Sequence, residues 1–126
     1  MQTTNYKDYV NYLLSLGYDK SVEYLIDKYG AATLPYFEET SYREFIDGKR
    51  EAPVKNNISR TREGLYCHHI REDKAILLST PKVIRQLKYP YEWQKPKNLV
   101  YCNLLEHLIL HALIAIENKD NSSNVR

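Results

Sequence analysis

The segment that combines a helix cap with a long apolar run, near the C-terminus, constrains the fold of this chain most. Asn103 can accept a hydrogen bond from the first turn of a helix, and Glu106 can return one to the Asn103 backbone. The residues that follow are mostly apolar and recur at the spacing of a helical face. We therefore expect a helix from about Leu104 to about Glu117, and a polar tail over 118–126.

Shorter apolar stripes predict three helices earlier in the chain. They cover 6–16, 21–29 and 40–46, and Ser21 is the expected N-cap of the second helix. We interpret residues 1–47 as an N-terminal helical module. Residues 48–63 have no apolar period, contain five basic side chains and predict a basic linker.

Residues 64–117 predict a second, mixed unit. Short apolar runs over 65–70 and 98–102 indicate two strands, and Pro81 indicates the start of a short helix that ends near Leu87. The first of these runs and a further one over 75–78, on either side of a polar turn, favour a hairpin or an irregular loop and strand. With the C-terminal helix, these elements predict an α+β fold.

Composition excludes several classes of protein. The chain has 126 residues, and its content of 43% hydrophobic and 27% charged residues is typical of one packed domain and not of a disordered chain. The apolar runs are shorter than the roughly 20 residues that cross a bilayer, so we expect no membrane partner. The N-terminus lacks a signal-like pattern, which predicts a cytoplasmic location. Two cysteines are too few for a disulfide scaffold.

The small net charge of +2 conceals an uneven distribution. Residues 1–47 carry a net charge of −4, whereas residues 48–111 carry +6. A basic half of this kind is typical of a surface that binds a polyanion, although a solvated basic face without a ligand is an equal alternative.

All four histidines fall at two places in the mixed unit. His107 and His111 lie four residues apart on the expected helix, so both imidazoles can face one metal ion. His68 and His69 end the first expected strand and point to opposite sides of it. One can therefore join a metal while the other faces a substrate, as metal-assisted hydrolysis requires. Hydrogen-bonded core histidines are the alternative.

The order and spacing of these residues resemble a known family. The pair His68-His69, then Asn98, then His107 and His111 are similar to the HNH (His-Me finger, ββα-metal) endonucleases of phages and bacteria, over about 64–116. The fold expected from this resemblance is an N-terminal helical module followed by a ββα-metal finger. The chain departs from the family in the 28 residues between His69 and Asn98, and it lacks CxxC pairs.

The resemblance also implies roles for individual residues. His69 would be the general base of phosphodiester hydrolysis, and Asn98 would hold the loop and strand that orient it. One divalent cation would be bound by His68, His107 and His111. The family implies Mg²⁺ or a transition-metal ion such as Mn²⁺, whereas imidazole ligands alone favour Zn²⁺ or Ni²⁺.

The expected partner is nucleic acid, with double-stranded DNA as the first candidate. Phosphate contacts are expected from the basic residues around the finger, namely Arg60, Arg62, Arg71, Lys74, Lys82 and Arg85. The N-terminal helices could form a homodimer or dock on a protein partner. A non-catalytic nucleic-acid- or protein-binding module, with a structural zinc held by the histidines, is the alternative function.

Overall fold

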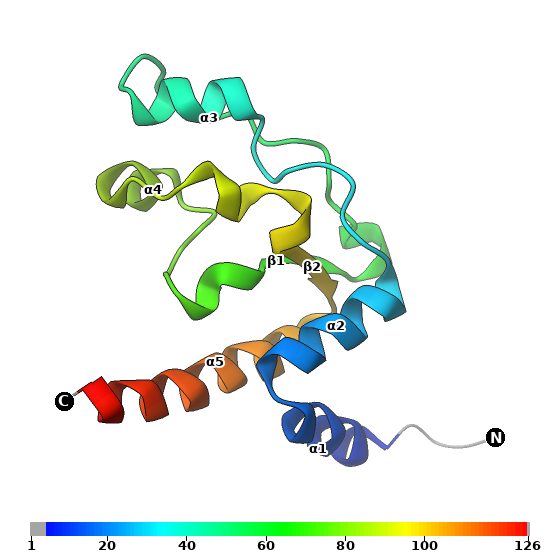
Figure 1. The fold of residues 1–126 in the computed structure, drawn as a ribbon. Coiled ribbons are helices and arrows are strands. Elements are labelled where there is room, and N and C mark those ends of the chain that lie inside the picture. Colours follow the sequence, from blue (N-terminus) through cyan, green and yellow to red (C-terminus); the bar gives the residue numbers. More distant parts are fainter. Residues whose placement is uncertain (1–4, 126) are drawn as a thin grey trace.

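The computed structural model describes residues 5–125 and has a mixed α+β fold. A two-stranded antiparallel hairpin packs against the C-terminal helix (Figure 1). The helices and strands are α1 (Tyr6–Leu16), α2 (Tyr18–Tyr29), α3 (Glu39–Ile46), β1 (Tyr66–His69), α4 (Pro81–Leu87), β2 (Leu99–Cys102) and α5 (Leu104–Val125). Short 3₁₀ turns connect them, namely η1 (Thr61–Glu63), η2 (Ile70–Asp73), η3 (Tyr91–Gln94) and η4 (Pro96–Asn98).

The predicted capping box begins α5. The Glu106 backbone N–H donates to Asn103 Oδ1 at 2.8 Å, and the Asn103 backbone N–H donates to Glu106 Oε1 at 2.8 Å. The helix continues to Val125, beyond the expected end near Glu117 and into the segment expected to be a polar tail. Neither glycine nor proline interrupts the sequence after residue 117, so nothing local forces the helix to end there.

The joint between α1 and α2 consists of one residue. Gly17 has φ +82° and ψ 177°, a backbone conformation that is essentially restricted to glycine. Because this single glycine makes the turn, α2 begins at Tyr18, and the prediction of an N-cap at Ser21 is wrong. Ser21 lies inside α2, where its buried hydroxyl donates to the Leu13 carbonyl at 2.8 Å.

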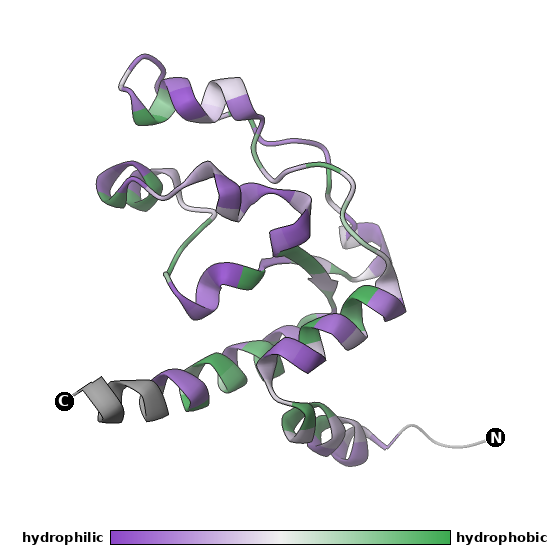
Figure 2. Ribbon diagram, in the orientation of Figure 1, coloured by the Kyte–Doolittle hydropathy of each residue, from purple (hydrophilic) through white to green (hydrophobic). Residues whose placement is uncertain are grey.

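The apolar faces of the helices meet in two main clusters. The first joins α1, α2, α5 and the hairpin through residues such as Leu13, Leu25, Val100, Leu110 and Leu113. The second joins α3, α4 and η3 on the other side of the hairpin, through Phe37, Tyr42, Leu78, Ile84 and Tyr91. Figure 2 shows hydrophobic and hydrophilic residues alternating along α1, as expected for a helix buried on one face.

Two segments between the helices and strands are largely irregular. Residues 48–63 pack against the chain around Phe37, which forms a β-bridge to Lys55, and they bury Ile58. The run over 75–78 forms no strand: Leu78 is fully buried, and the preceding Leu77 has φ +58°. Ala75 and Leu78 contribute to the second cluster, whereas Ile76 and Leu77 are exposed. Over residues 5–125, no helix has both the length and the apolarity to cross a bilayer.

Candidate metal centre

Three of the four histidines lie together where the hairpin meets α5. His68 comes from β1, and His107 and His111 come from one face of α5, so that one ring nitrogen of each lies within 4.8 Å of the others. The His68 ring centroid is 5.1 Å from each of the other two, which are 4.6 Å apart. The structure therefore brings together the three residues predicted as metal ligands.

The spacing of the ring nitrogens fits a metal ion. The Nε2 atoms of His107 and His111 are 3.1 Å apart. Two nitrogens bound to a tetrahedral zinc ion, each at roughly 2.0–2.1 Å from it, are about 3.3 Å apart. His107 and His111 therefore lie close to the separation of two ligands of one ion, and a ring nitrogen of His68 lies within 4.8 Å of theirs.

Burial keeps all three imidazoles neutral. It lowers the pKa of His68 to about 2, with further lowering by the neighbouring His107 and His111. The pKa values of His107 and His111 are also lowered, chiefly by burial. Neutral imidazole is the form that binds metal ions, so near pH 7 the lone pairs are available. His68 Nδ1 is buried and finds no hydrogen-bond partner among the described residues, so its lone pair can be given to a metal ion.

The centre is closed on one side and open on the other. His68 is 1% exposed, whereas His107 is half-buried and His111 is exposed. Across the described part of the chain, this donor group has three members and includes no carboxylate or thiolate. Burial raises the pKa of Cys67 and of Cys102 to about 12, so both remain thiols. Three protein ligands leave a coordination position for water or substrate, as in catalytic zinc sites.

His69 points to the other face of β1 and is held there by a hydrogen bond. Its Nε2 lies 2.7 Å from Gln94 Oε1, and the Gln94 amide nitrogen donates to the Leu78 carbonyl at 2.9 Å. Because Gln94 Oε1 can only accept, His69 Nε2 carries the proton and Nδ1 carries the lone pair. Burial lowers the pKa of His69 to about 4, against the opposing effect of the Gln94 hydrogen bond. A neutral imidazole with a free Nδ1 can act as a base, although His69 is 1% exposed.

The Asn98 side chain forms a hydrogen bond within the loop before β2. Asn98 lies at the end of η4, and its amide donates to the Glu92 carbonyl at 2.8 Å. Gln94 provides the hydrogen bond to His69 in this structure. Gln94 is fully buried, but a glutamine in a polar loop carries no pattern in the sequence that would identify it.

The six predicted phosphate-binding residues divide into two groups. Arg60 binds Glu63 and the Tyr29 carbonyl, Arg85 binds two backbone carbonyls and stacks on Phe45, and Arg71 lies 3.6 Å from Asp73. The other group is exposed, and no ion pair is found for its members within the described residues; it comprises Arg62, Lys74 and Lys82. The second group is the better candidate for contacts with an external polyanion.

A pocket of about 210 Å³ adjoins the metal centre, since His107 forms part of its wall. The Tyr66 ring, also in the wall, stacks on His107 with 20° between the ring planes. Lys55 lies at the same pocket, with its ammonium 4.9 Å from the centroid of the Tyr36 ring. Tyr36 in turn packs on His69, with ring centroids 4.6 Å apart. A basic pocket therefore lies between the two histidine environments.

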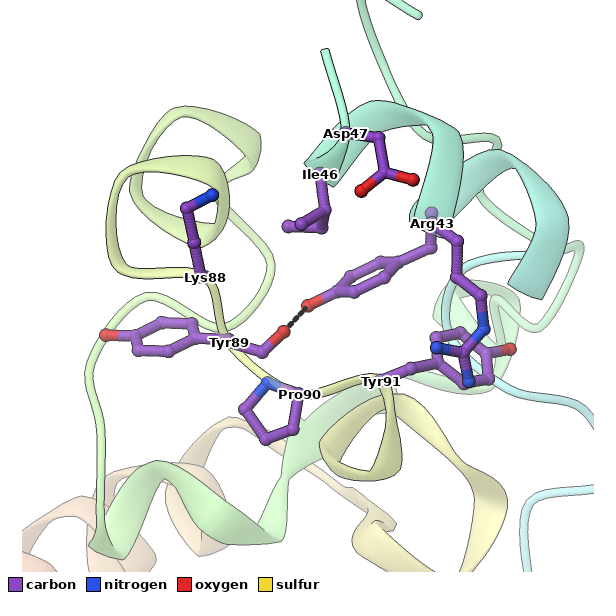
Figure 3. A pocket seen from close by; sticks show the side chains of 8 residues that line it. Arg43, Ile46, Asp47, Lys88, Tyr89, Pro90 and Tyr91 are labelled. Carbon is purple, nitrogen blue, oxygen red and sulfur yellow. Dashed lines mark hydrogen bonds between the residues drawn. The ribbon is translucent and has the colours of Figure 1, made fainter. Parts of the chain in front are cut away.

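Another pocket, of about 290 Å³, lies between α3 and the segment after α4 (Figure 3). The Tyr42 hydroxyl donates to the Tyr89 carbonyl at 2.8 Å, and the close-up shows Arg43, Asp47 and Lys88 around the opening. Arg43 is engaged by Glu39 and lies over the Tyr91 ring. None of the four histidines lines this pocket, so it lacks the chemistry of the metal centre.

No protein family, curated protein or solved structure matches this chain. The chemistry of the site therefore rests on its own geometry. That geometry comprises a three-histidine cluster that can bind a metal ion, an open side facing solvent, and a fourth, neutral histidine on the adjoining strand position.

Proposed function

We propose that this protein is a metal-dependent endonuclease of the HNH type, which hydrolyses phosphodiester bonds of nucleic acid. The observation that carries the proposal is the open three-imidazole centre on a hairpin and helix, with neutral His69 next to His68 on β1. Double-stranded DNA is the substrate we favour, because the chain carries exposed basic residues that suit a phosphate backbone.

The donor set indicates which ion the centre would hold. Three neutral nitrogens suit Zn²⁺ or Ni²⁺, whereas Mg²⁺ and Mn²⁺ prefer oxygen ligands. The ion would be held by His68, His107 and His111, and it would polarise the phosphoryl group and stabilise the leaving oxygen.

The residues of the chain supply the remaining steps of the mechanism. His69 accepts the proton of the attacking water at Nδ1, while Gln94 holds the proton on Nε2 and so fixes the ring. Lys55 and the exposed basic side chains neutralise the phosphates on either side of the scissile bond. Because His69 is deeply buried, a local opening beside Tyr36 must admit the water.

One observation favours the alternative of a binding module with a structural metal. His69 is 1% exposed and its Nε2 is engaged, as expected of a core histidine with satisfied hydrogen bonds. On that alternative, the ion stabilises the hairpin and α5 and takes no part in chemistry.

Substitution of His69 separates the two functions. We expect His69→Gln to reduce cleavage of supercoiled plasmid by about 10²-fold or more, since a general base contributes 10²–10⁴ to the rate. Zinc affinity is expected to change little, because the variant keeps the three ligands. The assay uses duplex DNA, single-stranded DNA and RNA with Zn²⁺, Ni²⁺, Mn²⁺ or Mg²⁺. A wild-type protein that binds zinc but cleaves none of them would establish the structural alternative.

Neutralising the exposed basic residues is expected to weaken duplex binding. Each phosphate contact contributes about 0.9 to the slope of log K against log salt concentration. The triple variant Arg62→Gln, Lys74→Gln, Lys82→Gln should therefore lower the magnitude of that slope by up to about 3, measured by fluorescence anisotropy at several salt concentrations. The control Lys7→Gln changes an exposed lysine on α1 and should leave the slope unchanged. An unchanged slope in the triple variant would place the polyanion on a different surface.

A further inference from the structure

The hydroxyl of Tyr18 contacts two groups at the base of the metal centre. It lies 2.9 Å from His68 Nε2 and 2.6 Å from the Ile70 carbonyl oxygen. The hydroxyl has one proton, and a carbonyl oxygen cannot donate. Tyr18 therefore donates its proton to Ile70 and accepts a hydrogen bond from the N–H of His68 Nε2.

This arrangement determines which nitrogen of His68 is free. With the proton fixed on Nε2, Nδ1 carries the lone pair, and Nδ1 is the buried atom for which no hydrogen-bond partner is found within residues 5–125. In the other tautomer, Nδ1 would carry the proton and could not bind an ion. The hydrogen bond to Tyr18 therefore selects the tautomer in which His68 is a ligand.

Tyr18 is itself held by the elements around it. It is the first residue of α2, directly after the Gly17 turn, and its backbone N–H donates to Glu117 Oε2 of α5 at 2.9 Å. Its ring is 2% exposed and packs edge-on against His68, with centroids 6.2 Å apart. Tyr18 is therefore held by its backbone N–H and by its hydroxyl.

We propose that Tyr18 is a positioning residue of the metal centre, which holds His68 in the Nε2–H tautomer so that Nδ1 binds the ion. The N-terminal helices thereby supply an outer contact of the centre. The proposal rests on the metal centre of the proposed function, but not on nuclease activity.

The test compares two tyrosine variants in the full chain. Tyr18→Phe should weaken Zn²⁺ binding 10–100-fold, the usual effect of removing an outer contact to a ligand histidine, as measured by competition with a chromogenic chelator. Tyr101→Phe is the matched control, because Tyr101 is also buried and donates to the Ile58 carbonyl at 2.6 Å. It should lose similar stability and bind Zn²⁺ within about twofold of the wild type. Equal zinc affinity in the two variants would overturn the proposal.

A measurement on the metal-free wild-type protein gives an independent answer even if Tyr18→Phe fails to fold. Nitrogen-15 NMR of the histidine rings should show His68 protonated on Nε2, with Nδ1 unprotonated, and a proton on Nδ1 would overturn the proposal. Absence of zinc binding by the wild-type chain would contradict both this proposal and the metal-dependent function. Zinc binding that depends on Tyr18, without cleavage of any nucleic acid, would contradict only the nuclease function.

Discussion

His111→Ala is expected to abolish the stabilisation that Zn²⁺ gives to the wild-type protein. A ligand at 100 times its dissociation constant stabilises the folded state by about 2.7 kcal/mol, which raises the melting temperature by several degrees. Loss of one of three ligands should weaken binding by more than about a hundredfold, since even outer contacts are worth 10–100-fold. The measurement is thermal unfolding with and without Zn²⁺, after treatment with a chelator.

His111 is the best of the three ligands for this test because it is exposed. Its removal leaves no cavity, so the metal-free variant should unfold at nearly the wild-type temperature. Leu108→Ala, on the same helix and at a side chain that is 60% exposed, is the control and should keep the zinc-dependent shift. An equal shift in His111→Ala would show that zinc binds elsewhere or without this residue.

Glu106→Gln is expected to destabilise the fold by roughly 2–4 kcal/mol. The Glu106 carboxylate is fully buried and accepts hydrogen bonds from Tyr9 at 2.6 Å, Lys28 at 2.6 Å, Tyr29 at 2.8 Å and the Asn103 backbone at 2.8 Å. Breaking a buried ion pair costs about 3–5 kcal/mol, and we reduce this value because the Lys28 side chain is 36% exposed and can turn to water.

The matched control for Glu106→Gln is Glu39→Gln, which removes an exposed ion pair with Arg43. Exposed pairs of this kind contribute about 0–1 kcal/mol, so the control should unfold close to the wild type. Both are compared by urea denaturation. If Glu106→Gln lowers the free energy of unfolding no more than Glu39→Gln does, the hydrogen bonds of the Glu106 carboxylate do not stabilise the fold.

The sequence predicts those parts of the fold that depend on local pattern. The helix over 6–16, the helix that begins at Pro81 and the Asn103–Glu106 capping box are confirmed, because each depends on residues within a few positions of one another. The residue at which α2 begins could not be predicted from local pattern. The first residue of α2 is set by the backbone conformation of Gly17, and other short turns could also have joined the two helices.

In the candidate site, too, the residues that follow a local pattern could be predicted and the others could not. The spacing of His107 and His111 places them on one helical face, and alternation along β1 separates His68 from His69, so the three-histidine cluster could be predicted. The residues that bind the histidines could not. Tyr18 is 50 residues from His68 and Gln94 is 25 residues from His69, and only the packed fold brings each pair together.

The position of Glu106 has a consequence for the order in which the protein acquires its structure during synthesis. The hydrogen bond between Tyr9 and Glu106 joins residues 97 apart, and that between Tyr18 and Glu117 joins residues 99 apart. During synthesis α1 and α2 leave the ribosome before α5, so the parts of their apolar faces that pack on α5 stay uncovered until α5 has emerged. Docking of the two ends closes a long loop, so it should be a late step, and a nascent chain that stops before Leu104 should leave α1 and α2 open to proteolysis.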